Sequence, residues 1–181
     1  HLQYNNQLKK KKMSTKWNLD PTHSEITFKV RHMMISNVKG NFNNFTATVE
    51  TEDDTFKNAT VKATLQTDSV DTNNADRDTH LKSAEFFNAE AHPEITFESD
   101  SLNSGITGNL TINGVTKPVQ LDVDFGGINV DPWGQTKAGF SFEGKISRKD
   151  FGLNWNAALE TGGVMVSDEV KIAGELQFVK A

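Results

Sequence analysis

The histidines are the first side chains to consider for metal binding or acid–base catalysis. His23, His32, His80 and His92 are far apart in the sequence, with no His-x-His and no i, i+4 pair. A zinc site needs three or four converging ligands, and closely spaced histidine pairs are a common signature of one. The chain also contains no cysteine, which excludes thiolate catalysis and cysteine-ligated metals. The sequence therefore predicts no metal site.

The remaining reactive groups favour ligand binding over catalysis. Arg77 could pair with Asp78 or a strand end, or its guanidinium could donate in a fork to a phosphate or carboxylate of a ligand. His32 is expected either in the core or against the same ligand group. His23 is expected to bond backbone at a turn, and His80 to cap or pack a short helix. The carboxylates are scattered, without a nucleophile elbow or a glycine-rich phosphate loop, so no catalytic residue is predicted.

These side chains belong to a chain in which apolar and polar residues alternate with period two. Between positions 25 and 34, one face carries Ile26, Phe28, Val30, His32 and Met34. A β-strand points successive side chains to opposite faces, so this pattern predicts a strand that is apolar on one side and wet on the other. Because the pattern returns about eight times, the sequence predicts an all-β, antiparallel protein.

The expected strands can be placed by their alternation. They cover about 23–34, 38–50, 61–66, 95–97, 106–112, 119–125, 138–142 and 170–178. Phe42 and Phe45 are three residues apart, which predicts a bulge or bend near Asn43 and Asn44. The Trp17–Pro21 segment is expected to lead into the first strand and to end in a turn. Gly126 and Gly127 are expected in the loop before the seventh strand.

Three connections have their own signals. The period breaks between positions 71 and 93, where residues 77–82 fit a short helix with Asn or Asp near its N-cap, between strands three and four. Asn113-Gly114 is a strong hairpin signal. The long connection 147–167 and the helix are expected to close or gate the ends of the fold.

A sheet with one apolar face must pack on a second layer or close on itself. The chain has twelve Phe and one Tyr, and Phe suits a dry interior because it needs no hydrogen-bond partner. We therefore expect an eight-stranded barrel with an apolar lumen. A barrel of that size is wide enough either to be filled by side chains or to hold one small ligand. Size alone leaves both alternatives open.

Composition limits the partners and the compartment. The formal charge is −5 without a basic cluster in the folded part, so nucleic acid is not an expected partner. No apolar run approaches the ~20 residues of a membrane-spanning helix.

Residues 1–16 are expected as a disordered extension. Within it, residues 1–12 are interpreted as a mis-called leader with Met13 as the true start, and a genuine flexible tail stays as the alternative. No signal peptide is seen, which favours the cytoplasm, with the periplasm as the alternative.

Several motifs in order resemble those of the YceI-like family of polyisoprenoid-binding, lipocalin-like β-barrels. They lie at residues 20–24 (DPTHS), 76–83 (DRDTHLKS), 86–88 (FFN), 93–99 (PEITFES), 108–119 (GNLTINGVTKPV), 148–153 (RKDFGL) and 167–170 (SDEV). The resemblance covers residues 17–178. It implies an extended barrel that holds a long-chain amphiphile such as a polyisoprenoid, an isoprenoid quinone or a fatty-acid-like lipid, with no other cofactor.

The expected function is therefore non-catalytic lipid binding by one barrel domain, residues 17–181. A lipid-modifying enzyme in the same cavity and a filled-core barrel acting through protein contacts stay as alternatives. A homodimer also stays open. The predicted ligand contacts are Phe28, Val30, His32, Phe45, Leu65, Arg77, Phe86, Phe97, Leu110, Ile112, Val123, Phe140, Phe142, Phe151 and Trp155.

Overall fold

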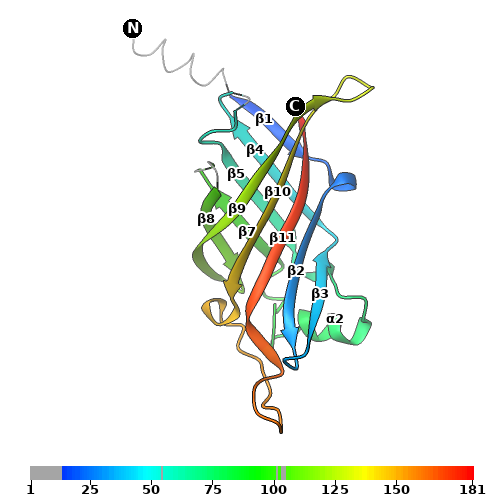
Figure 1. The fold of residues 1–181 in the computed structure, drawn as a ribbon, viewed down its shortest axis with the longest axis vertical. Coiled ribbons are helices and arrows are strands. Elements are labelled where there is room, and N and C mark those ends of the chain that lie inside the picture. Colours follow the sequence, from blue (N-terminus) through cyan, green and yellow to red (C-terminus); the bar gives the residue numbers. More distant parts are fainter. Residues whose placement is uncertain (1–13, 54, 101, 103–104) are drawn as a thin grey trace.

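The strands form an antiparallel sheet that closes on itself in the computed structural model, which describes residues 14–53, 55–100, 102 and 105–181 (Figure 1). Within this part, the closed barrel has eight strands: β1 (Thr15–Leu19), β4 (Phe45–Thr51), β5 (Thr60–Gln66), β7 (Glu94–Ser99), β8 (Gly105–Ile112), β9 (Val115–Val130), β10 (Thr136–Ser147) and β11 (Val166–Lys180). The ring closes where β11 pairs with β1. The predicted all-β barrel of eight antiparallel strands is confirmed.

Three further strands extend the sheet from β11. They are β2 (Glu25–His32), β3 (Ser36–Phe42) and β6 (Val70–Asp71). β1 and β2 both pair antiparallel to β11, at Phe178–Lys180 and Val166–Glu175 respectively. β1 and β2 therefore act as one long strand that is interrupted between them. β3 and β4 likewise form one interrupted strand, because β3 pairs with β2 and β4 pairs with β1.

Both breaks have local causes. Asp20 caps the short 3₁₀ helix η1 (Pro21–His23), where its Oδ1 accepts a hydrogen bond from the Thr22 amide at 3.0 Å. Proline in this position supplies no amide to a ladder. The second break lies at Asn43 and Asn44, between β3 and β4, as predicted from the spacing of the two phenylalanines.

Three expectations about strand limits were wrong. The segment that starts at Trp17 is not a lead-in, because Trp17 pairs with Val49 and Lys180 inside β1. β1 also takes in Thr15 and Lys16, which had been expected in the disordered extension; residues 1–13 lie outside the described part. Gly126 and Gly127 are not in a loop but inside β9, where the register shifts between Gly139 and Phe140 of β10. Glycine with positive φ at position 127 suits such a bulge.

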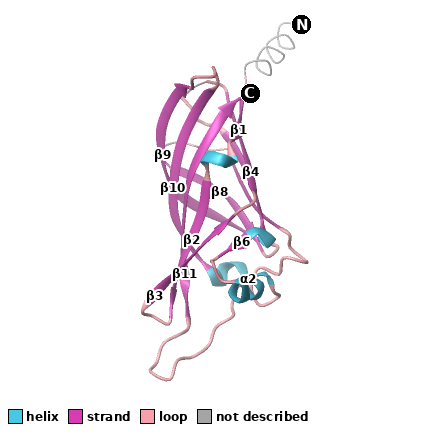
Figure 2. Cartoon of the chain, turned by 90° about the vertical axis from the view of Figure 1, so that its right-hand side faces the viewer, coloured by secondary structure: helices cyan, strands magenta, loops and turns pink. Residues whose placement is uncertain are grey.

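The connections agree with the sequence signals more closely. The predicted helix is α2 (Ala75–Lys82), which lies between β6 and β7 and is capped by the Asn74 side chain. Asn113-Gly114 forms the tight turn between β8 and β9. The other short helices are η2 (Thr67–Ser69) and η3 (Arg148–Phe151). Figure 2 shows α2 at the same end of the barrel as the loop that follows η3.

Candidate functional site

The barrel encloses a cavity of about 630 Å³. Side chains from β2–β5 and β7–β11 line it, and its wall is almost wholly apolar. Ligand pockets commonly have volumes of this order and predominantly apolar walls with a few polar groups. The barrel is therefore not the filled core that the sequence left open as an alternative.

One end of the cavity is closed by an aromatic plug, made of Trp17, Phe56, Phe140 and Phe178. The Trp17 and Phe56 rings are 5.1 Å apart between centroids, and Phe140 contacts both Phe56 (5.0 Å) and Phe178 (6.0 Å). None of the four is more than 9% exposed. Tilted and edge-to-face contacts of this kind are favourable between aromatic rings. The plug therefore forms an apolar floor.

Glycines explain why a lumen rich in phenylalanine stays open. Phe28 is paired with Gly40 across β2 and β3, and Phe142 with Gly174 across β10 and β11. A Cβ on Gly40 would lie 2.3 Å from Phe28 Cζ, and one on Gly174 would lie 2.2 Å from Phe142 Cε1. The rings thus occupy the space that a neighbouring side chain would need. They lie flat on the wall and leave the centre free.

The other end of the cavity is its polar end. Asn74, Asp76, Arg77 and His80, on or next to α2, join its lining there. The His80 ring lies 4.9 Å from the Trp155 and Phe86 rings, so α2 and the connection after β10 meet at this end. Both elements were expected to close or gate the ends of the fold, but they lie at the same end.

Arg77 is held by a strand end rather than by Asp78. Its Nε donates to Thr72 Oγ1 at 2.8 Å and its Nη2 donates to the Thr72 carbonyl at 2.7 Å. Asp78 Oδ1 accepts from the Thr72 amide at 2.9 Å. Thr72 is buried, so these bonds fix the direction of the guanidinium. Its remaining N–H groups are available to an anionic or carbonyl group at the cavity mouth.

Arg148 is a polar cavity-lining residue that the sequence-based set of contacts missed. It is only 6% exposed. Its Nε donates to the Ser167 carbonyl at 2.9 Å, while Nη1 bonds the carbonyls of Leu153 and Trp155 at 3.0 and 3.2 Å. Nη2 donates to the Val166 carbonyl at 3.3 Å. These four bonds anchor the 147–167 connection to the start of β11.

Charge balance around Arg148 comes from Asp168. Burial lowers the pKa of the Arg148 guanidinium, and the negative charge of Asp168 opposes that shift. For Asp168, burial would raise the carboxyl pKa, but hydrogen bonds from Ser147 Oγ and the Lys149 amide produce a net lowering. Both groups therefore remain charged at neutral pH.

Most of the predicted ligand contacts lie on the cavity wall. These are Phe28, Val30, His32, Leu65, Arg77, Phe86, Phe97, Leu110, Ile112, Val123, Phe140, Phe142 and Trp155. Phe45 and Phe151 do not belong there. They pack instead in a core cluster with Leu65 and Ile95, at 8% and 1% exposure. Phe45 follows the interruption between β3 and β4 at Asn43 and Asn44, and Phe151 ends η3. The alternation of a regular strand therefore does not predict which way these two side chains point.

The histidines are not gathered into one site. His23 Nδ1 lies 3.0 Å from Asp20 Oδ2, so it bonds a side chain rather than the backbone expected. His80 Nε2 lies 2.6 Å from Glu85 Oε2 at the helix end. His32 lines the cavity at the end of β2. In the described ranges, no three His, Asp or Glu side chains come together in a way that could hold a metal ion.

Other contributors to the site were also missing from the predicted set. Phe56 reaches the plug from a loop, with a positive φ of 60° that no strand pattern indicates. Ile26, Val38, Phe42, Leu81, Phe87 and Met165 line the cavity as well. Ile26, Val38 and Phe42 lie on expected strands, so their pattern could have found them. Arg148 carries no such signal, because an isolated arginine usually indicates exposed surface.

Comparisons with known proteins agree with this geometry. A family model described as a YceI-like domain matches residues 17–178. A UPF0312 protein of Staphylococcus epidermidis is 40% identical over 166 residues, which cover 91% of this chain and 97% of the relative. The crystal structure of the Campylobacter jejuni YceI protein is 34% identical with a TM-score of 0.70, covering 82% of this chain and 88% of the other.

A more distant solved structure has the same fold. It is a polyisoprenoid-binding domain from Saccharophagus degradans, 16% identical, with a TM-score of 0.68, covering 91% of this chain and 98% of that one. The fold and cavity define a closed antiparallel barrel with an apolar internal pocket. The chain belongs to the YceI-like family. Among its described residues, no helix is both long and apolar enough to cross a membrane.

Proposed function

We propose that this protein binds and carries a long-chain isoprenoid or similar amphiphilic lipid, without changing it chemically. The observation that carries the proposal is the cavity of about 630 Å³, apolar along its length, floored by the aromatic plug and polar only at its open end. An amphiphile fits that gradient with its tail inward and its headgroup beside Arg77 and His80.

The cavity volume sets the length of the enclosed tail. A water molecule occupies about 30 Å³ in the liquid, and a methylene group is of similar size, so the cavity holds roughly 20 chain carbons. Burial at ~0.8 kcal/mol per carbon gives about 16 kcal/mol, against association costs on the order of 4–15 kcal/mol. The tail alone therefore supports useful affinity, and the headgroup can contribute little.

The family gives independent support. A polyisoprenoid-binding domain shares the fold of this chain. Carriage rather than catalysis is proposed because Arg77 and Arg148 are both engaged with backbone or Thr72 in positions that suit anchoring. His80 lies at the mouth beside Glu85 rather than in the apolar interior that would enclose the tail.

Extraction of the purified protein tests the proposal. We expect mass spectrometry of an organic extract to find a prenyl or other long-chain lipid in near-stoichiometric amount. Incubation with the identified lipid should return it unchanged, whereas a modified product would favour an enzyme. A protein that yields no lipid and does not take up an added prenyl alcohol would contradict the proposal.

A further inference from the structure

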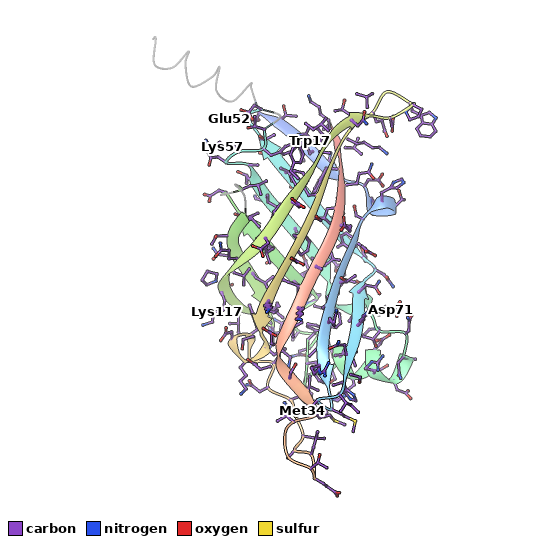
Figure 3. All side chains as sticks on the ribbon, in the orientation of Figure 1. Trp17, Met34, Glu52, Lys57, Asp71 and Lys117 are labelled. Carbon is purple, nitrogen blue, oxygen red and sulfur yellow. The ribbon has the colours of Figure 1, made fainter. Side chains whose placement is uncertain are left out.

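The open end of the barrel carries exposed apolar side chains on two neighbouring loops. Met33, Met34 and Ile35, in the turn between β2 and β3, are 41%, 56% and 77% exposed. Val164, in the loop before β11, is 42% exposed. Figure 3 shows Met34 at the end of the molecule opposite Trp17 of the aromatic plug. We call these four residues the apolar tip.

The two loops form one surface. The Met33 amide donates to the Met165 carbonyl at 2.7 Å. A Cβ on Gly163 would lie 2.1 Å from Met34 Sδ, so the methionine side chain rests directly on that glycine. His32 and Met165, which adjoin the tip, both line the cavity. The apolar tip is therefore part of the rim of the cavity mouth.

The turn uses residues that its backbone disfavours. Met33 and Met34 have φ of 50° and 63°, a region that costs a residue with a β-carbon roughly 1–2 kcal/mol. The same chain uses the favoured Asn113-Gly114 pair, with φ of 54° and 74°, in the tight turn between β8 and β9. Such local strain is characteristic of functional sites.

A row of lysines crosses the outer wall near this end. Register pairs Lys145 with Lys171, Lys171 with Lys29, and Lys29 with Lys39, so four lysines stand side by side on β10, β11, β2 and β3. Lys145 reaches Glu169 at 3.7 Å. The other three make no ion pair within the part of the chain that the structure describes. Like charges placed directly opposite across strands destabilise a sheet.

The lysine row also stands out against the rest of the protein, whose formal charge is −5. Lys29 is four residues from Met33, so the row lies roughly 13 Å along the strand from the tip. If the tip enters a membrane interface by roughly 5–10 Å, the row comes within the ~8 Å screening length of its surface at physiological salt. Arg31 adds a further positive charge between the row and the tip, where the acidic residues of β11 have partners of their own: Glu169 pairs with Lys145, and Asp168 accepts from Ser147 and the Lys149 amide. Glu160 is the single acidic residue among positions 33–35 and 156–165.

We propose that this end of the barrel docks on an anionic lipid bilayer. The apolar tip enters the interface, where amphipathic elements bury their apolar face roughly 5–10 Å deep, and the lysine row and Arg31 face the anionic headgroups. Docking turns the cavity mouth toward the membrane, so a lipid can pass between bilayer and barrel without crossing water. This step extends the proposed carriage of a lipid and rests on it.

The opposite end of the barrel also exposes apolar side chains, among them Val130 and Trp133, and can be compared with the apolar tip as a docking site. Trp133 is 84% exposed in the loop between β9 and β10. The nearby Lys137 is neutralised by Asp131 and Asp20, at 3.4 and 3.7 Å. That end is also closed by the aromatic plug. Charge and access to the cavity therefore both favour the end with Met33 and Met34 as the end that docks.

Vesicle flotation of the full chain tests the proposal, with vesicles of phosphatidylcholine alone and of equal parts phosphatidylcholine and phosphatidylglycerol. We expect binding to the anionic vesicles only, and weaker binding when salt rises from roughly 0.1 M to 1 M, where the screening length falls to ~3 Å. The double variant Met33→Asn/Met34→Gly gives the turn its preferred residues. It should be at least as stable as the wild type and bind at least ten-fold more weakly.

The charge variant is Lys29→Gln/Lys171→Gln. At an anionic surface, each lysine raises the binding affinity about five-fold, so the loss of both should lower the affinity about 25-fold. Removal of like charges should not lower stability. Lys16→Gln/Lys57→Gln makes the same charge change at the end of the barrel that carries the aromatic plug, where Figure 3 shows Lys57 near Trp17, and should lose far less affinity. Trp133→Gln should bind as the wild type does. All variants retain the lysines at positions 9–12, so any effect of these is common to all.

Three results would overturn the docking proposal: equal binding to neutral vesicles, equal loss in the two lysine pairs, or loss on Trp133→Gln instead of at the tip. Capture of an acidic soluble protein or a nucleic acid by the lysine row, without vesicle binding, would also overturn it. Uptake of a soluble prenyl alcohol, measured in parallel, separates the two proposals. Uptake without vesicle binding refutes docking alone, and vesicle binding without uptake refutes lipid carriage.

Discussion

The most direct test of the cavity is to shorten it from inside. Ala63 on β5 and Ala47 on β4 face each other in register, and both line the cavity. Two small residues in adjacent strands leave space where larger ones would fill the lumen. Ala63→Phe places a ring in that space, against Phe97 on the neighbouring β7. We expect it to reduce the length of lipid that the barrel accepts.

The size of the effect follows from the cavity volume. The added ring occupies about six of the roughly 20 carbon-sized positions, which is about one isoprene unit of the tail. Loss of about five buried carbons at ~0.8 kcal/mol each costs about 4 kcal/mol, or roughly 10³-fold in affinity for a full-length tail. The empty barrel should not be destabilised, because the ring fills space that was vacant.

Two measurements follow the change. Mass spectrometry of organic extracts should show shorter lipids bound to Ala63→Phe than to the wild type. Titration with geranylgeraniol and farnesol, which differ by one isoprene unit, should show the loss for the longer alcohol only. Lys62→Phe carries the same ring on the outer face of β5 and serves as the control. Unchanged lipid length and affinity in Ala63→Phe would refute the placement of the tail in this cavity.

Three further predictions concern the wall, the mouth and the strand break. Gly174→Ala should push the Phe142 ring into the lumen, since the new Cβ would lie 2.2 Å from Cε1, and so weaken lipid binding about ten-fold while circular dichroism stays that of the folded barrel. Arg148→Ala removes the side-chain donor from the Ser167, Leu153 and Trp155 carbonyls and one of two donors from the Val166 carbonyl, and should lower the free energy of unfolding in urea by about 3–5 kcal/mol; a loss below 1 kcal/mol would contradict its anchoring role. Asp20 has its pKa lowered to about 2 by hydrogen bonds from Thr22 and His23, so its contribution is fully present above about pH 4 and is lost as the pH falls toward 2. In denaturant titrations, the stability advantage of the wild type over Asp20→Asn should therefore shrink by about 1 kcal/mol across that range, after allowance for solvent screening, and a constant difference would contradict this.

Much of the fold could be predicted because its signals are local. Alternation along each strand identified the inward residues, such as Phe28 on β2 and Phe97 on β7. The Asn113-Gly114 turn and the helix after Asn74 also follow from short-range backbone preferences. The interruption at Pro21 was not expected. The chain leaves the sheet at the end of β1 and re-enters it as β2, which pairs with the same neighbour, β11. Only pairing with β11 reveals that continuity.

Much of the site depended on contacts between distant segments. Phe56 and Trp17 meet in the aromatic plug although nearly forty residues separate them, and neither belongs to an expected strand. Gly40 and Gly174 keep the lumen open only because Phe28 and Phe142 lie across from them.

The sequence by itself determined which side chains face inward, because a strand alternates its faces whatever its neighbours are. Whether that interior is filled or hollow was decided by tertiary structure alone. Ring position on the wall, closure of one end and the buried anchoring of Arg148 all depend on cross-strand register and on packing between segments far apart in the chain. A one-dimensional pattern does not contain those distances.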